Sequence, residues 1–334
     1  MQVRRVFSTI DAHGGGQPLR IVTSGVPHLQ GGTYRARREY LRQHHDSVRT
    51  LLLHEPRGHA DMYGAVLLTP TIEGADFGVV FMTNEGYSTM CGHGIIALTT
   101  ALIDTGAVAV QEGDTRITFE TPAGLINARA SVSDGRVRDV RFRNVPAFRL
   151  AAALPVNVNG IDISVDVSYG GAWYAQVDAA RLEVNLAKTP VREIAALGMA
   201  VKAAVSNAID VVHPDDPDIS GLYGTTFFEP RGGDGLTLRT ATIYARGAVD
   251  RSPCGTGTSA LVASLAADGR IGVGDTLVNE GPCGTVFTGR VVVSTNVGQH
   301  PAVVTEIAGR GAVTGLHQFL VDPDDQVGNG FLLR

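Results

Sequence analysis

Two cysteines of this chain stand in the same short motif. Residues 90–98 read MCGHGIIAL and residues 253–261 read PCGTGTSAL, so Cys91 and Cys254 share the form C-G-x-G-x-x-A-L. Each motif leads into an apolar stretch that ends at a glycine, Gly106 or Gly269. Two thiols presented in the same way by two halves of a chain can serve one substrate as acid and base. Such a pair is what the inversion of a carbon centre requires.

The setting of each cysteine favours chemistry as well. Both are expected where a strand or turn gives way to a helix, and the first N–H groups of a helix have no partner within it. The helix dipole adds about half a positive charge there, which lowers the pKa of a thiol from its usual value of about 8.5. The same N–H groups can bind a carboxylate. Four glycines without side chains would let a ligand approach the backbone: Gly92, Gly94, Gly255 and Gly257.

A pair of this kind suits the removal and return of an α-proton of an amino acid. A thiolate on one face of the carbon would take the proton, and a thiol on the other face would return one. Donors fixed on the carboxylate would stabilise the enolate-like charge that develops. The two thiols should titrate as a unit, with one thiolate and one thiol as the working state.

Other interpretations of the motifs are weaker. A single cysteine before a buried helix is more often an inert core residue. Two cysteines in two copies of the same motif favour a catalytic role. Cys91 and His93 could begin a metal site, yet no second pair has ligand spacing, so no metal is expected. Residues 255–259 resemble a phosphate loop without its lysine. A disulfide between Cys91 and Cys254 would be a product of oxidation.

The scarcity of lysine excludes the main cofactor for amino-acid inversion. Lys188 and Lys202 are the only two lysines, and a pyridoxal-phosphate racemase needs one as its Schiff base. Lys188 lies in a polar turn and Lys202 in the middle of an apolar-periodic helix, and neither setting suits that cofactor. We therefore expect a reaction without any cofactor.

The duplication extends beyond the cysteines and predicts the elements that position them. Gly-Asp-Thr recurs at 113–115 and 274–276, Pro-x-Gly at 122–124 and 282–284, and a glycine-rich opening at 11–16 and 166–171. A two-copy repeat of this length indicates a duplicated domain, because solenoids repeat in about 20–50 residues. Cys283 aligns with Ala123, which suggests packing rather than chemistry.

Periodicity predicts a mixed α and β fold. Residues 79–82, 116–119 and 291–294 alternate as strands do. Residues 92–104 and 255–267 predict buried helices stopped by glycine. Residues 33–49 and 190–207 predict amphipathic surface helices, the second with Thr189 as a possible N-cap. The stretch 151–159 looks irregular and is the expected domain junction. We predict an N-terminal domain, 1–150, with a tail of about 318–334 that crosses back to it, and a C-terminal domain, 151–317.

The composition and charge of the chain limit the classes of molecule that it is expected to bind and the compartment in which it is expected to work. The chain has 334 residues with 44% hydrophobic and 18% charged residues, as in soluble enzymes of two domains. The net charge of −5 and the absence of a basic run argue against nucleic acid. No apolar run reaches the roughly 18–20 residues of a membrane span. Without a signal peptide, 3 cysteines fit the reducing cytoplasm. A homodimer is one admissible assembly.

The motifs resemble those of a known family, the proline racemases. Residues 90–94 and 250–258 look like its two signatures, MCGHG and DRSPCGTGT. Residues 11–20 resemble its opening, 55–62 its early loop, 165–171 the start of its second domain, and 322–331 its ending. The resemblance covers nearly the whole chain.

This resemblance implies a fold, a site and a substrate class. The fold would be α+β, with two pseudo-symmetric domains that each wrap a curved sheet around a central helix, similar to diaminopimelate epimerase, and the active site would lie between them. Cys91 and Cys254 would be the acid/base residues. Gly92, His93, Gly255 and Thr256 would bind the carboxylate of a free imino acid, and Asp250 its ring amine.

Within the family, a chain with both cysteines resembles the proline racemases and the 4-hydroxyproline 2-epimerases. A chain with threonine in place of the second cysteine resembles the trans-3-hydroxy-L-proline dehydratases. This chain keeps both cysteines, which favours a 4-hydroxyproline 2-epimerase. However, residues 84–89 look more like the dehydratases, and strand 237–244 lacks the histidine expected of a hydroxyproline epimerase. Dehydration is therefore the alternative hypothesis, and an inactive amino-acid-binding homologue is a third.

Overall fold

The internal contacts of the computed structural model divide the chain into two units. Unit 1 comprises Met1–Phe142 with Gly309–Arg334, and unit 2 comprises Arg143–Ala308. The structure describes residues 5–232 and 236–333. The division falls earlier than the predicted junction: the stretch 151–159, expected to be irregular, lies up to Val158 inside one long strand, β8 (Arg136–Val158).

Unit 1 is a sheet with one central helix and two short outer helices. Its elements are β1 (Arg5–Gly14), β2 (Gln17–Ser24), α1 (Tyr34–His44), α2 (Ser47–Leu53), β3 (Tyr63–Leu68), β4 (Phe77–Thr83), β5 (Tyr87–Ser88), α3 (Gly92–Asp104), β6 (Gly113–Thr121), β7 (Gly124–Ser133), the start of β8, and β19 (Gly311–Val321).

Unit 2 repeats this plan after the rest of β8. Its elements are β9 (Ile161–Tyr169), β10 (Trp173–Asp178), the 3-10 helix η1 (Ala179–Leu182), α4 (Val191–Ala208), β11 (Val212–His213), β12 (Asp216–Ser220), β13 (Gly224–Pro230), β14 (Thr237–Tyr244), β15 (Ala248–Val249), α5 (Gly255–Ala267), β16 (Thr276–Glu280), β17 (Val286–Val297) and β18 (His300–Gly309).

Strand pairing confirms the duplication. In unit 1, β1 and β2 form a hairpin, β2 pairs with β3 in parallel, β3 with β4 antiparallel, β4 with β6 in parallel, and β6 with β7 antiparallel. In unit 2, β9, β10, β13, β14, β16 and β17 follow the same order with the same directions. The predicted α+β class and the two similar halves are therefore correct.

The repeated sequence triplets fall at equivalent places in the two units. Gly113 opens β6, and Gly274 stands two residues before β16. The two Pro-x-Gly segments form the turns that follow these strands, and each glycine-rich opening forms the hairpin turn at the start of its unit. Cys283 lies in the second of these turns and is exposed, so the suggestion that it has a packing role is not supported.

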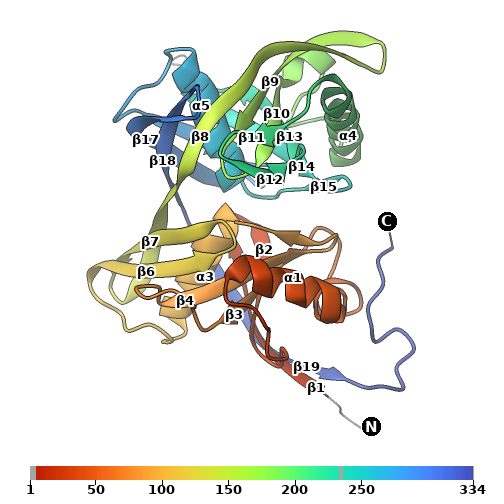
Figure 1. Ribbon diagram of the computed structural model, residues 1–334, viewed down its shortest axis with the longest axis vertical. Coiled ribbons are helices and arrows are strands. Elements are labelled where there is room, and N and C mark those ends of the chain that lie inside the picture. Colours follow the sequence, from red (N-terminus) through yellow and green to blue (C-terminus); the bar gives the residue numbers. More distant parts are fainter. Residues whose placement is uncertain (1–4, 233–235, 334) are drawn as a thin grey trace. The chain divides into compact units, whose positions relative to one another are not determined.

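A central helix in each unit carries one of the two cysteine motifs. α3 packs against β1, β2, β7 and β19, and α5 packs against β9, β10 and β17 (Figure 1). Both helices have the predicted bounds, 92–104 and 255–267, and nearly all their residues are buried. A helix that is apolar on every side is expected to be enclosed in this way. These two helices position the candidate site.

The outer helices differ from the prediction in detail. The single helix expected over 33–49 is two helices, because the backbone leaves the helical conformation at His45 (φ −140°, ψ 28°) and Asp46 precedes α2. The N-cap of α4 is Pro190 rather than Thr189. The Thr189 hydroxyl instead accepts a hydrogen bond from the Asn185 N–H, so it stabilises the turn before the helix.

The last strand returns to unit 1. β19 pairs antiparallel with β1 along its length, from Gly311 opposite Gly14 to Val321 opposite Arg5. Beyond it, Phe331 bridges to Glu55, and the Arg57 guanidinium donates to the Gly328 carbonyl oxygen at 2.7 Å. The segment that belongs to unit 1 begins at Gly309, nine residues before the predicted crossing point at about 318.

Candidate active site

Cys91 occupies the N-cap position of α3 in unit 1. It has an ordinary extended backbone, with φ −146° and ψ 111°, and its side chain is buried. The Cys91 Sγ lies 3.3 Å from Nδ1 and 3.5 Å from Nε2 of His93. Burial lowers the pKa of His93 to about 3, so this imidazole is neutral and keeps one N–H that can donate to a thiolate.

Cys254 occupies the same position of α5 in unit 2, but its backbone differs. Its φ of 63° lies in the left-handed region, which costs a non-glycine residue on the order of 1–3 kcal/mol and is found mainly at functional sites. The Gly257 N–H donates to Cys254 Sγ at 3.3 Å. The thiol therefore caps the helix itself and reaches the N–H groups that were predicted to attract it.

The ionisation of Cys254 corrects one expectation from the sequence. Burial raises the pKa of this thiol to about 12, and the nearby charge of Asp250 adds to the rise. Removing a thiolate from water costs more than the partial charge of a helix terminus returns. In the free protein, Cys254 is accordingly a thiol at neutral pH, ready to donate a proton rather than to take one.

Asp250 lies beside Cys254 as a buried carboxyl group. Its Oδ1 accepts hydrogen bonds from the Ser252 N–H at 2.8 Å and from the Ser252 hydroxyl at 2.7 Å. Burial raises the pKa of Asp250 to about 6, and the two Ser252 bonds oppose that rise. Above this pH, the group is a carboxylate with little water around it, which is suited to pair with a cation.

The predicted site residues fall into two groups. Gly92 and His93 form the first turn of α3 next to Cys91. Gly255 and Thr256 begin α5 next to Cys254, and Asp250 lies in the loop before it. Each unit thus contains a thiol at the N-terminal N–H groups of a helix, and the carboxylate of Asp250 lies in unit 2.

Two further polar side chains contact this site and were not among the predicted site residues: Ser252, inside the second signature, and Tyr174. Ser252 holds Asp250 and also accepts from the Cys254 N–H at 3.1 Å. The Tyr174 hydroxyl lies 2.6 Å from Thr256 Oγ1 and 3.5 Å from Cys254 Sγ. Tyr174 comes from β10, far from Cys254 in sequence, and the repeat gives no hint of it because the strand pairing puts Leu19 at the equivalent place in unit 1.

Two of the motif glycines make room for the thiols. A Cβ on Gly94 would lie 3.0 Å from Cys91 Sγ and 2.5 Å from the Phe81 ring, and a Cβ on Gly257 would lie 3.1 Å from Cys254 Sγ. The sequence suggested that these glycines admit a ligand. In the structure, the space that they leave is filled by the chain's own side chains.

The hairpin glycines bring each sheet close to its helix. A Cβ on Gly14 would lie 2.2 Å from the His93 carbonyl oxygen, and one on Gly170 would lie 2.3 Å from that of Thr256. Both obstacles are backbone atoms in the first turn of a central helix, which cannot move away like a flexible side chain. These glycines fix the position of the residues that follow the two cysteines.

We therefore expect Gly170→Ala to destabilise the protein by about 1–3 kcal/mol or more, as overpacking against a fixed backbone does. Thermal unfolding of this variant and of Gly272→Ala, in the same unit, provides the measurement. A Cβ on Gly272 meets only Asp275 Oδ2, at 3.8 Å, so this control should unfold like the parent. Equal melting temperatures for all three proteins would contradict the close approach.

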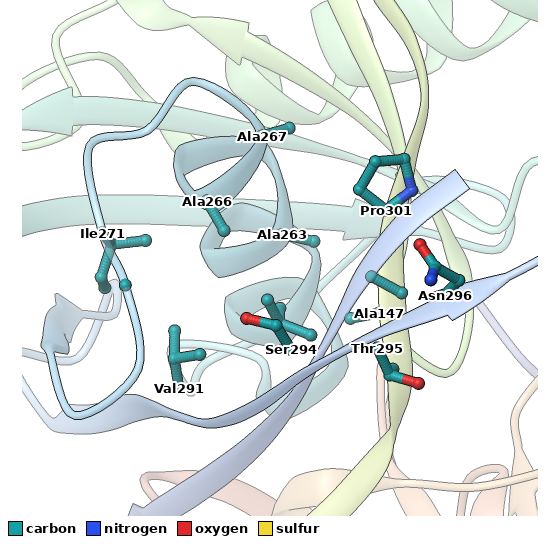
Figure 2. A pocket seen from close by; sticks show the side chains of 13 residues that line it. Ala147, Ala263, Ala266, Ala267, Ile271, Val291, Ser294, Thr295, Asn296 and Pro301 are labelled. Atoms are coloured by element: carbon teal, nitrogen blue, oxygen red, sulfur yellow. The ribbon is translucent and has the colours of Figure 1, made fainter. Parts of the chain in front are cut away.

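A cavity of about 370 Å³ lies at the other end of α5 (Figure 2). Its lining includes Ala263, Ala266, Ser294, Asn296 and Pro301 and contains no ionisable side chain. Ala266 follows Cys254 by twelve residues, about 18 Å along a helix. A pocket without acid, base or charge does not suit proton transfer on an amino acid, so the candidate site stays at the cysteine end of the helix.

Other features of the described residues bear on ligands. Over residues 5–232 and 236–333, no three His, Cys, Asp or Glu side chains gather as a metal site. In the same residues, no helix is both long and apolar enough to cross a membrane. The Lys202 ammonium donates to the carbonyl oxygens of Tyr223 and Ala245, at 2.9 and 3.4 Å.

Comparison with known proteins places this chain in a family. The proline racemase family model matches residues 9–332. A trans-3-hydroxy-L-proline dehydratase of Bacillus cereus is 42% identical over 333 residues, all of both chains. A 3-hydroxyproline 2-epimerase of Burkholderia multivorans is 42% identical over 335 residues, again all of both chains.

A solved structure agrees with this placement. The hydroxyproline epimerase of Agrobacterium vitis, with bound trans-4-hydroxy-L-proline, superposes with a TM-score of 0.91 at 34% identity and covers 100% of this chain and 96% of its own. The family resemblance predicted from the sequence is thereby confirmed, and the chain belongs to the proline racemase family.

Proposed function

We propose that this protein is a cofactor-independent epimerase that inverts Cα of a free hydroxyproline, with Cys91 and Cys254 as its acid/base pair. The observation that carries this proposal is the equivalent placement of two buried thiols, each at the N-cap of a central helix in a proline racemase-family chain. Inversion needs one group to take a proton from one face of the carbon and another to return a proton to the opposite face.

The other site residues receive roles from their chemistry. The N–H groups of Gly92, His93, Gly255 and Thr256 would bind the carboxylate, because helix N-termini bind anions. The same donors would stabilise the enolate-like charge that forms as the α-proton leaves. The Asp250 carboxylate would pair with the ring ammonium. The ammonium would also reduce the field of Asp250 on the Cys254 thiol and so ease its ionisation.

The lysines support a reaction without pyridoxal phosphate. Lys202 is half-buried and its ammonium is bound to two backbone carbonyl oxygens. A Schiff base would require this group to leave both partners. Lys188 lies in an exposed turn before α4. Neither setting suits a Schiff-base lysine, so the proposed chemistry rests on the thiols.

Dehydration of trans-3-hydroxy-L-proline is the second candidate, because several relatives at 42% identity carry that name. In this substrate the carboxylate and the hydroxyl group lie on opposite faces of the ring, so Cα–H and the C3 hydroxyl share one face. A single base beside a proton donor would be enough for elimination. Each thiol has such a neighbour: His93 beside Cys91, and the Thr256–Tyr174 pair beside Cys254.

The segment before Cys91 shows how the dehydratase-like residues are used. The Tyr87 hydroxyl donates to Asp46 Oδ1 at 2.8 Å, and the Arg49 guanidinium pairs with the same carboxylate at 2.7 Å. Tyr87 therefore fixes the turn to α2. Tyr87 has a structural role, and its presence does not by itself decide between epimerisation and elimination.

The test is a screen of proline and the 3- and 4-hydroxyproline stereoisomers in deuterium oxide. We expect deuterium at Cα together with formation of the Cα epimer, separated by chiral chromatography. A cyclic imine trapped by borohydride from trans-3-hydroxy-L-proline would instead establish the dehydratase. If no stereoisomer exchanges or eliminates, both proposals are wrong.

A further inference from the structure

A buried phenol adjoins the second thiol. Tyr174 is fully buried and lies in a small cluster with Cys254 and Ala260. Its hydroxyl is 2.6 Å from Thr256 Oγ1 and 3.5 Å from Cys254 Sγ. Since no part of Tyr174 reaches the surface, the phenol can influence a substrate only through these two neighbours.

The distances indicate the direction of the hydrogen bonds. A phenol has one proton to donate, and the 2.6 Å contact to Thr256 is the short one. Burial raises the pKa of Tyr174 well above its usual value, so the phenol keeps this proton. Once Thr256 Oγ1 accepts it, the threonine's own proton is free to point elsewhere. Cys254 Sγ, 3.8 Å away, is within reach of it.

Aromatic packing holds the phenol in place. The Tyr174 ring meets Tyr223 edge to face with centroids 5.8 Å apart, and Tyr223 stacks on Tyr244 at 5.7 Å. The Lys202 ammonium binds the Tyr223 carbonyl oxygen. A hydroxyl on a ring fixed in this way aims its proton in one direction at little further entropic cost.

We propose that Tyr174 is a positioning residue that orients the Thr256 hydroxyl group so that it donates toward Cys254 and stabilises the thiolate of that residue. This inference deepens the proposed function, and rests on it in treating Cys254 as one of the two acid/base groups. Tyr174 does not touch the substrate. Its effect on the reaction passes through Thr256.

The two thiols are consequently tuned by different groups. Cys91 has the imidazole of His93 at 3.3 Å. Cys254 has a chain of two hydroxyl groups, those of Thr256 and Tyr174, and the residue of unit 1 that corresponds to Tyr174 in the strand pairing is Leu19, whose side chain has no donor. The two cysteine motifs are alike, but the hydrogen-bond donors beside the two thiols differ. The two thiols are therefore expected to differ in pKa.

The test is the rate of Cys254 alkylation by iodoacetamide without any substrate, followed by peptide mass spectrometry from neutral to alkaline pH. Only a thiolate reacts. In Tyr174→Phe we expect a decrease of about three- to tenfold, because one pKa unit is a tenfold change in thiolate below the pKa. If the parent thiol resists the reagent, thiolate ultraviolet absorbance in a Cys91→Ala, Cys283→Ala background replaces it.

Two further variants separate positioning from packing. Tyr169→Phe removes another buried phenol of unit 2, one that packs on Phe148 and Trp173, and should leave the alkylation rate unchanged. In a Thr256→Val background, Tyr174→Phe should have no further effect, because residues that act through one another are not additive.

An unchanged alkylation rate in Tyr174→Phe, or an equal loss in the Thr256→Val background, would overturn the proposal. Because the readout needs no turnover, it stands apart from the proposed function, which fails separately if no hydroxyproline exchanges. With an active substrate, we expect Tyr174→Phe to lower kcat and to leave KM nearly unchanged.

Discussion

Cys91→Ala and Cys254→Ala are each expected to lower the rate of Cα inversion by about a thousandfold or more, since a positioned acid or base contributes about 10²–10⁴. The two losses should not add, because a pair that acts as a unit fails when either member is removed. Neither change should unfold the protein, since both side chains are small and stand at the ends of helices.

The informative measurement is deuterium exchange at Cα from each epimer separately. A single remaining thiol can remove a proton and return a deuteron on its own face, so each variant should exchange one epimer and not the other. The epimer that exchanges identifies the face that the thiol serves. Cys283→Ala provides the control, because that thiol is exposed in a turn. Normal inversion in either alanine variant would refute the two-thiol mechanism.

The central helices could be predicted to the residue because each is a run of small and branched apolar residues between a cysteine–glycine start and a glycine end. The positions of the repeated triplets likewise fixed which strands are equivalent. The bounds of the outer helices were harder to predict from the sequence. Asp46 divides the predicted helix 33–49, since its carboxylate is occupied by Arg49 and Tyr87, and Tyr87 lies 41 positions further along the chain.

The unit boundary was missed for a related reason. Residues 143–158 continue the strand of unit 1 into unit 2 as β8, and a change of unit inside one strand has no signature in composition. Tyr174 was missed because its partner, Thr256, lies 82 residues away. The rise in the pKa of Cys254 was missed because burial, unlike a helix start, cannot be read from a local motif.

Asp250→Asn is expected to weaken catalysis and to stabilise the free protein. Loss of the carboxylate should lower kcat/KM about a hundredfold or more, because an ammonium without its buried partner costs several kcal/mol. In the parent, kcat/KM should fall as the pH drops below about 6, the pKa of Asp250, since the protonated carboxyl no longer pairs with the ring ammonium. The variant should lack this decline.

The stability gain follows from the direction of the same shift. The folded protein holds the Asp250 proton more tightly than the unfolded chain does, so the free energy of unfolding falls as the pH rises from about 4 to about 6. Above that window, the buried charge costs about 3 kcal/mol, from roughly two pKa units. Asparagine can still accept from Ser252 and carries no charge, so the variant avoids this cost.

Calorimetric melting temperatures of the parent and of Asp250→Asn across this range give the measurement. The two curves should coincide at about pH 4 and separate as the pH rises, with the variant higher. Asp215→Asn, an exposed aspartate of the same unit, should follow the parent throughout. A variant that melts lower at neutral pH would show that Asp250 stabilises the fold. A lower kcat/KM together with a higher melting temperature in Asp250→Asn would show instead that the buried charge of Asp250 destabilises the parent protein and is needed for the reaction.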